Sequence, residues 1–270
     1  MRKDNLSSED INPGQELKKV LENLYPLNQE ELSFVGEIDR SFKEDGKLVE
    51  IFYQSTINYL IRRLINTTEY LKREHESSEL QNKLFITKLR NFFQQETWID
   101  DENIERLISI LQLCIDEKRR KRKSKKKDLI KNRIEILCYV CGKSLEEDKV
   151  EVEHMWPKSM GGITLSSNLK VCCSECNKNK EQYIDASDFH YEQISLGTRK
   201  SDDSFEREFR GVYKVALSAK SDYSCSLCGQ PVEVVGRLNF VQRNPNDSWH
   251  FLNIDGICNS CISLGDQNGD

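Results

Sequence analysis

Four pairs of cysteines, each separated by two residues, constrain this chain more than any other feature of its sequence. A Cys-x-x-Cys pair places two thiolates where both can bind one tetrahedral metal ion. Two such pairs complete one site, so the spacing predicts two structural zinc sites rather than disulfides or thioredoxin-like redox chemistry. The predicted ligands are Cys138, Cys141, Cys173 and Cys176 for the first zinc, and Cys225, Cys228, Cys258 and Cys261 for the second.

Residues 15–117 are predicted to form a helical domain. Their apolar residues recur at intervals of three and four, which is typical of amphipathic helices that pack on one another. We expect four or five helices, which serve either as a plain scaffold or as a docking module for a partner chain. Cys114 falls in such a stripe and is expected to be a small core residue. The stripes include Leu17, Val20, Leu21 and Leu24, and Ile104, Leu107, Ile108 and Leu111.

The formal net charge of −5 is distributed unevenly. Residues 118–133 contain eleven Lys or Arg and one Asp, a net charge of +10, whereas the rest of the chain sums to −15. We expect this run to prolong the last helix as a basic connector and to bind nucleic-acid phosphates. A solvated linker and a localisation tag are the alternatives. The predicted phosphate contacts are Arg119, Arg120, Lys121, Arg122, Lys123, Lys125, Lys126 and Lys127.

The composition predicts a chain without membrane segments. Charged residues make up 31% and apolar residues 37% of the sequence, and no apolar run approaches the roughly 20 residues that a membrane span needs. Residues 1–14 are polar, lack the apolar stretch of a secretion signal and are expected to be flexible. The expected location is therefore cytoplasmic.

A second set of residues lies around the first two cysteine pairs, in the order Glu153-His154, Gly161-Gly162, Asn168-Leu169 and Asn177. Residues 134–183 thereby resemble the HNH endonuclease family, in which two strands and a helix surround a catalytic divalent ion beside a Cys₄ zinc. The resemblance implies hydrolysis of nucleic-acid phosphodiesters, in DNA above all, with Mg²⁺ or Mn²⁺, leaving 5′-phosphate and 3′-hydroxyl ends. The chain also resembles effector nucleases of bacterial anti-phage systems, whose activity waits on a partner.

The residue types suit this chemistry. An imidazole titrates near neutral pH and can deprotonate water, and a hard divalent ion prefers carboxylate and amide oxygens. The resemblance implies that His154 is the general base, that Glu153 and Asn177 bind the ion, and that Asn168 pins the loop and orients His154. Lys180 is expected to contact a phosphate or to be a solvated lysine. The family most often has Asp where Glu153 stands, and its name implies His where Asn177 stands.

Residues 209–265 repeat this layout without the catalytic residues. The segment that corresponds to the acid–histidine pair reads Leu238-Asn239-Phe240-Val241, and Ile262 stands where the first module has Asn177. This module is either a degenerate HNH-like copy or an independent zinc ribbon, and it is expected to bind DNA or a partner. Residues 150–152 and 232–235 are expected to be short β-like pieces.

The expected chain is thus α+β, with an all-helical N-terminal domain, a ββα-metal module with structural zinc, and a second zinc module. The predicted boundaries are a flexible terminus at 1–14, the helical domain at 15–117, the basic connector at 118–133, the nuclease module at 134–183, a linker at 184–208 and the second module at 209–265. The rival function is a non-catalytic zinc-binding adaptor for nucleic acid or a protein partner.

Overall fold

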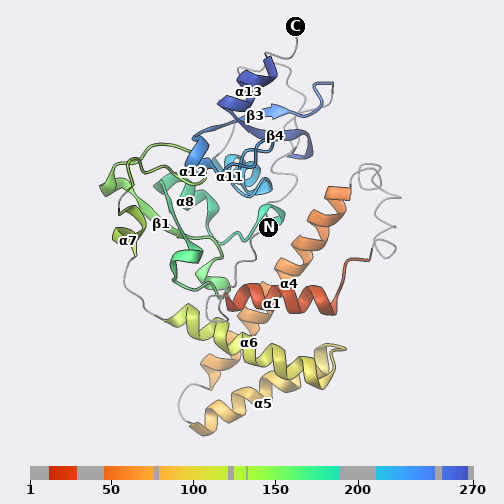
Figure 1. Cartoon of the computed structure of the whole chain (residues 1–270). Helices are drawn as coiled ribbons and strands as arrows, with labels where there is room; N and C mark the ends of the chain where they lie inside the picture. The colour runs from red at the N-terminus through yellow and green to blue at the C-terminus, as the bar shows by residue number, and fades with distance from the viewer. Residues whose placement is uncertain are drawn as a thin grey trace. The chain divides into compact units, whose positions relative to one another are not determined.

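The computed structural model describes residues 12–28, 46–75, 79–120, 125–131, 133–188, 211–246 and 251–266 (Figure 1). The chain divides into two compact units. Unit 1 comprises residues 1–123 and 154–168, and unit 2 comprises residues 124–153 and 169–270. Within the described ranges, no helix combines the length and the apolar character needed to cross a membrane. These units are defined by contacts, whereas the boundaries predicted from the sequence follow its composition. The units therefore do not test the predicted boundaries, which stay a prediction.

In its described residues, unit 1 contains four α-helices: α1 (Pro13–Leu24), α4 (Gly46–Glu74), α5 (Glu79–Glu96) and α6 (Asp101–Arg119). α4 and α6 each pack against all three of the other described helices. The first turn of α6 is capped by Asp100, whose carboxylate accepts a hydrogen bond of 2.9 Å from the backbone N–H of Asn103. Seven of the eight residues of the predicted apolar stripes are buried, namely Leu17, Val20, Leu21, Ile104, Leu107, Ile108 and Leu111, whereas Leu24 is only half-buried.

A loop from the nuclease module, residues 154–168, belongs to unit 1 and packs into its core. The loop contains the short 3₁₀ helices η2 (Lys158–Met160) and η3 (Ser166–Asn168), and η2 contacts α4 and α6. Gly161 turns with a φ of +78°, and a Cβ there would lie 2.7 Å from the Sγ of Cys114. A side chain at Gly14, at the start of α1, would lie 1.8 Å from the carbonyl oxygen of Met160. Glycines at both positions therefore allow helix and loop to approach closely.

Unit 2 contains the first zinc module, whose core is a ββα arrangement. After α7 (Lys126–Ile130) and the 3₁₀ turn η1 (Glu147–Lys149), strand β1 (Glu151–His154) pairs with β2 (Leu169–Cys172), and helix α8 (Ser174–Lys180) follows. The turn η4 (Ala186–Asp188) ends this part of the chain. α8 begins directly after β2 because Cys173 caps it, its Sγ accepting a hydrogen bond from the N–H of Cys176. The predicted α+β class with a ββα module is confirmed.

The second zinc module repeats this order. It consists of helix α11 (Gly211–Lys220), helix α12 (Val232–Val235), strand β3 (Leu238–Gln242), the 3₁₀ turn η5 (Phe251–Asn253), strand β4 (Ile254–Cys258) and helix α13 (Asn259–Asp266). β3 and β4 pair antiparallel, with Leu238 opposite Cys258 and Gln242 opposite Ile254. A ββα unit thus occurs twice, each time with one zinc cysteine pair before its first strand and the other pair at the junction of its second strand and helix.

The two zinc modules pack against each other inside unit 2. Helix α11 contacts both α8 of the first module and β4 of the second. The rings of Tyr139 and Tyr223 meet edge to face with their centroids 4.8 Å apart, and the hydroxyl of Ser218 donates to the carbonyl of Val140. Glu233 joins the modules further, because it accepts from both Lys170 and Arg133. The modules therefore share one folded body and do not form two separate domains.

Two local predictions are wrong. Residues 232–235 form helix α12 and not a strand, because Pro231 and Gly236 bound a single turn that buries Val232 beside Cys225. The basic run does not prolong α6, since the helix ends at Arg119 and Arg120 has extended backbone. Like charges on successive turns repel, which disfavours a continued helix through this run. Apolar residues at helical spacing between Phe205 and Leu217 also predict a helix; it is observed from Gly211 onward, and residues 205–210 lie outside the described residues.

Candidate active site

The eight cysteines of the four pairs gather into two four-thiol clusters. Within each cluster, the ligand sulfurs all lie within 4.8 Å of one another. Each first pair sits on the same tight turn: the N–H of Gly142 donates to the carbonyl of Cys138 over 2.8 Å, and that of Gly229 to Cys225 over 2.9 Å. Both glycines have a φ of +68°. Four sulfurs at these separations fit a tetrahedral zinc ion, so both predicted zinc sites have the donors they need.

The electrostatics of these clusters favour thiolates at one cysteine of each site. Hydrogen bonds from neighbouring thiols, that of Cys141 first, lower the pKa of Cys138 to about 2. Burial raises the pKa of Cys225, but backbone N–H groups of its own turn and of Cys258 outweigh burial and lower that pKa to about 6. The thiolate is the form that binds a metal. In contrast, burial raises the pKa of Cys114 to about 12, which agrees with its expected role as a core residue.

Two carboxylates on one face of β1 meet two side chains of α8. Residues two apart on a strand share a face, and residues three apart on a helix do the same. The Oε2 of Glu151 accepts a hydrogen bond of 2.6 Å from the amide nitrogen of Asn177. The Nζ of Lys180 donates to the Oε1 of Glu153 over 3.0 Å. The two predicted ligands of the catalytic ion thus lie on elements that contact each other, but each is bonded to another residue, Asn177 to Glu151 and Glu153 to Lys180. The sequence did not single out Glu151.

Of the two expectations for Lys180, the solvated lysine is wrong. Its side chain is only 2% exposed, and its ammonium forms an ion pair with Glu153, whose side chain is 13% exposed. Lys180 is therefore a buried lysine with a carboxylate partner. Its predicted contact with a phosphate stays a prediction, and the partner that the structure gives it is a carboxylate.

His154 follows Glu153 directly and contacts a different residue. Its Nε2 shares a hydrogen bond of 3.1 Å with the hydroxyl of Thr164 in the same loop. Glu153 and His154 thus find different partners from consecutive positions in β1, as the alternation of side chains along a strand requires. The peptide bond between them is also where the chain passes from unit 2 to unit 1. Thr164, like Glu151, was not among the predicted site residues.

Asn168 closes the loop that begins at His154. Its side chain is 2% exposed, and its amide makes three hydrogen bonds to backbone. The oxygen accepts from the N–H of Trp156 at 2.8 Å, and the nitrogen donates to the carbonyls of Trp156 at 3.0 Å and Ile163 at 2.9 Å. Asn12, which precedes α1, accepts from the N–H of Ile163 at 2.9 Å. The loop is therefore fastened both to itself and to the helical unit.

The second module has an asparagine with the same kind of hydrogen bonds to the backbone but lacks the acid–histidine pair. The amide of Asn253 accepts from the N–H of Asn244 at 2.8 Å and donates to its carbonyl at 3.0 Å. Asn253 and Asn244 thus correspond to Asn168 and Trp156. This match places Gln242, the residue two before Asn244, at the position of His154. Both modules thus contain a zinc-binding turn, a ββα unit and an asparagine whose side chain bonds to the backbone, in the same order. This order favours a degenerate HNH-like copy over an independent zinc ribbon.

Part of the basic run makes contacts inside the protein. The Nζ of Lys118 pairs with Glu69 at 2.7 Å, and Arg120 pairs with Glu117 at 3.0 Å. Lys125 lies 3.5 Å from the carboxylate of Asp128. Five of the eight predicted phosphate contacts in this run lie within the described residues, namely Arg119, Arg120, Lys125, Lys126 and Lys127, whereas Lys121, Arg122 and Lys123 lie outside them.

Comparison with known proteins identifies one part of the chain. Residues 138–188 match the family model of the HNH endonucleases. No curated protein and no solved structure matches the chain significantly. The matched segment begins at the first zinc cysteine and contains β1, β2, α8 and the loop between the strands.

Proposed function

From the match of residues 138–188 to the family model of the HNH endonucleases, we propose that the chain is a metal-dependent endonuclease acting on nucleic acid, with DNA as the preferred substrate. The observation that carries the proposal is the set of side-chain contacts between β1 and α8 inside the matched segment. Glu151 and Glu153 lie on one face of β1 and contact Asn177 and Lys180 of α8, and His154 follows at the end of the strand.

In the proposed reaction, His154 takes a proton from a water molecule, whose oxygen attacks phosphorus. The bond between phosphorus and the 3′-oxygen breaks, which leaves 5′-phosphate and 3′-hydroxyl ends. The hydroxyl of Thr164 holds the imidazole through the hydrogen bond at Nε2, and Asn168 holds the loop that carries both residues. A water-activating imidazole should contribute at least about 100-fold to the rate.

The donor set on β1 and α8 suits a hard divalent ion such as Mg²⁺ or Mn²⁺. The carboxylate of Glu153 and the amide oxygen of Asn177 would hold it, as proposed from the sequence, and Glu151 adds a carboxylate in contact with Asn177. Such an ion would stabilise the charge on the phosphate oxygens and on the departing oxygen. Until an ion binds, Lys180 supplies the positive charge beside Glu153.

The test is His154→Ala, compared with Gln242→Ala, its counterpart in the second module. Both proteins should melt like the wild type and bind two zinc ions. Cleavage of plasmid DNA in the presence of Mg²⁺ or Mn²⁺ should fall at least about 100-fold for His154→Ala and stay unchanged for Gln242→Ala. Cleavage by His154→Ala within tenfold of wild type would remove His154 from the mechanism.

A non-catalytic zinc adaptor is the second candidate, and the ion pair between Lys180 and Glu153 favours it. A carboxylate already neutralised by a buried ammonium has less need of a metal ion. Both candidates require zinc and bind nucleic acid, so neither property separates them. Cleavage that depends on added Mg²⁺ or Mn²⁺ does: an adaptor would show none with single-stranded DNA, duplex DNA or RNA.

The cellular setting belongs to the same proposal. We expect a cytoplasmic effector nuclease of an anti-phage system, with a protein partner docked on the helices of unit 1. The support is that the loop from His154 to Asn168 packs on α4 and α6, so a partner on these helices would act on the residues next to the proposed base. Affinity purification from the native host, followed by cleavage assays with and without the recovered partner, tests this setting.

A further inference from the structure

The carboxylate of Glu151 bonds to one of the two proposed ion ligands. Its Oε2 accepts a hydrogen bond of 2.6 Å from the side-chain nitrogen of Asn177, which links the start of β1 to the middle of α8. Both side chains are half-buried. An ionised carboxylate accepts hydrogen bonds and donates none, so the part of the amide that faces Glu151 is its NH₂ group. The contact therefore fixes which way the amide of Asn177 is turned.

This orientation leaves the amide oxygen of Asn177 available to an ion. The oxygen and the nitrogen of a planar carboxamide point in different directions, so Oδ1 faces away from Glu151. Within the described residues, the side chain of Asn177 bonds to Glu151 through its nitrogen, and Oδ1 accepts no hydrogen bond there. A hard divalent ion binds amide oxygens, whereas an NH₂ group offers it only donors. An amide turned the other way would not bind the ion.

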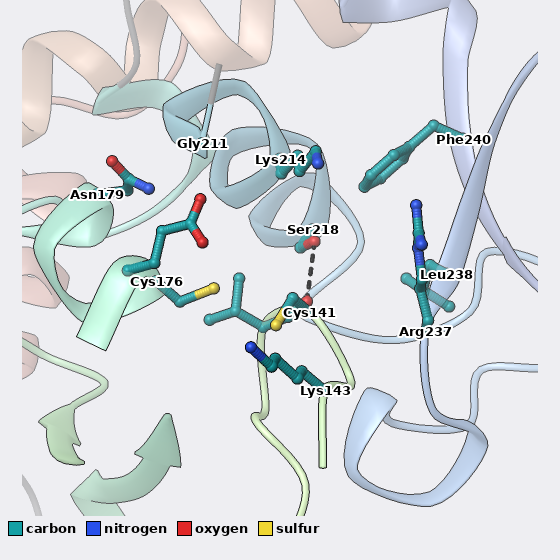
Figure 2. Close-up of a pocket in the computed structure, with 12 residues that line it drawn as sticks. Cys141, Lys143, Cys176, Asn179, Gly211, Lys214, Ser218, Arg237, Leu238 and Phe240 are labelled. Atoms are coloured by element: carbon teal, nitrogen blue, oxygen red, sulfur yellow. Dashed lines mark hydrogen bonds between the residues drawn. The ribbon is translucent and has the colours of Figure 1, made fainter. Parts of the chain in front are cut away.

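Helix α8 presents different residues to β1 and to the second zinc module. Asn177 and Lys180 bond to carboxylates of β1. Glu175 and Asn179 instead line a cavity between the two zinc modules, and Figure 2 shows Asn179 at its edge. Asn177 is not among the residues that line this cavity. The contact with Glu151 is therefore the one that orients its amide in the described part of the chain.

The second module lacks this contact together with the acid–histidine pair. Asn239 stands where the first module has Glu151, three positions before the counterpart of the histidine, and Ile262 stands where it has Asn177. Ile262 offers no amide, and the side chain of Asn239 donates to that of Asn259 over 2.7 Å. A ββα unit with a four-cysteine cluster nevertheless forms. The zinc fold thus does not require such a pair, which favours a role for the pair at the proposed ion site.

We propose that Glu151 is a positioning residue, whose carboxylate holds the amide of Asn177 with its oxygen toward the catalytic divalent ion. The inference rests on the proposed function in that this ion is the one used for cleavage. Glu151 acts through Asn177 and is not itself a ligand. Replacing a residue that orients a metal ligand commonly weakens metal binding by about 10- to 100-fold.

The experiment measures Mn²⁺ binding to the zinc-loaded full chain by electron paramagnetic resonance, without nucleic acid and without cleavage. Glu151→Gln keeps the length of the side chain and can still accept from the amide, but it can also donate and so no longer fixes the orientation. It should weaken Mn²⁺ binding at least about tenfold. Its melting temperature should fall by no more than about 4 °C, since the hydrogen bond can still form.

Glu175→Gln is the matched control for the loss of a negative charge. This exposed carboxylate lies on the same helix but lines the cavity and not the face toward β1. Because solvent and salt screen exposed charges, Glu175→Gln should leave the Mn²⁺ affinity within about twofold of wild type. An equal loss of affinity in both variants would assign the effect to charge in general and overturn the positioning role.

A double-mutant cycle separates positioning from direct binding. Asn177→Ala removes the amide, so adding Glu151→Gln in that background should weaken Mn²⁺ binding by less than about threefold further. If Glu151 were itself a ligand, its replacement would cost as much without the amide as with it. Additive effects would therefore overturn the proposal.

A measurement on the wild type removes the dependence on variants that fold poorly. In NMR spectra of the chain labelled with ¹⁵N-asparagine, Mg²⁺ should shift the side-chain resonance of Asn177, whose NH₂ protons should exchange more slowly than those of exposed asparagines. An unshifted resonance or equally fast exchange would overturn the proposal. Absence of Mn²⁺ binding by the wild type would overturn the proposed metal site as well, whereas equal binding by wild type and Glu151→Gln would overturn this inference alone.

Discussion

Replacing Lys180 by Met should destabilise the protein by about 3 kcal/mol, because it leaves the carboxylate of Glu153 buried without its partner. The two charged atoms lie 3.0 Å apart, and their side chains are 2% and 13% exposed. With an effective dielectric constant of about 20, two unit charges at this distance attract by about 5.5 kcal/mol. Desolvation offsets much of that attraction while the pair is intact, but removal of one partner typically costs about 3 to 5 kcal/mol.

The assay is thermal unfolding of the zinc-loaded full chain, followed by circular dichroism. A loss of about 3 kcal/mol corresponds to a drop in melting temperature of about 6 to 12 °C for a chain of this size. Lys178→Met on the same helix is the control, because that lysine is exposed and its removal should cost less than about 0.5 kcal/mol. Adding Glu153→Gln to Lys180→Met should recover at least about 1.5 kcal/mol, since no buried charge then remains.

The same variant connects stability to the proposed metal site. If Glu153 binds a divalent ion, Mg²⁺ should raise the melting temperature of Lys180→Met more than that of the wild type, because the ion replaces the missing ammonium. The reasoning about the buried pair would be refuted by a Lys180→Met protein that melts within 1 °C of wild type. An equal response to Mg²⁺ in both proteins would instead speak against Glu153 as a ligand.

Three further predictions concern the zinc sites, the buried asparagines Asn168 and Asn253, and the basic run. Elemental analysis should find two zinc ions per chain that survive mild dialysis against EDTA, while cleavage is lost and then restored by Mg²⁺ or Mn²⁺. Cys138→Ser should unfold the first module. A wild-type content of one zinc ion or none would contradict the two-site prediction. Asn168→Ala and Asn253→Ala should each lower stability by about 1 to 3 kcal/mol, since each leaves buried backbone groups unpaired, but Asn168→Ala alone should slow cleavage. Changing the five basic residues 119–123 to Gln should reduce the slope of log K against log salt for duplex DNA binding by about 4. Equal slopes for the variant and the wild type would mean that DNA binds to another part of the protein.

The zinc clusters and the ββα order could be predicted because both depend on short-range features of the sequence. The spacing of a Cys-x-x-Cys pair defines a metal-binding turn almost independently of its surroundings, and both clusters have the predicted members. The apolar stripes of α1 and α6 are likewise visible as periodicity, and their residues are buried. The HNH segment was recognisable for the same reason, since its residues fall within about fifty positions.

Features that depend on distant contacts could not be predicted. The hydrogen bond from Ile163 to Asn12 joins residues 151 positions apart, and no local pattern indicates it. The burial of Lys180 depends on the position of Glu153 across the sheet and helix, so its sequence context resembles that of a solvated lysine. Val232 has strand propensity, but its place in the second zinc core requires a helical turn there. In each case a tertiary contact outweighs the local preference.

The second module separates what the fold needs from what the proposed chemistry needs. Both modules have a glycine turn at the first cysteine pair and an asparagine, Asn168 or Asn253, that fastens the connection between the strands. An interaction present in a module without an acid–histidine pair cannot be explained by catalysis alone, so we expect Asn168 to act by positioning the loop. The contacts that distinguish the first module are those of Glu151 with Asn177, Glu153 with Lys180, and His154 with its threonine. The reaction should therefore depend on residues that make these contacts, His154 above all, because the second module forms the same ββα unit without an acid–histidine pair.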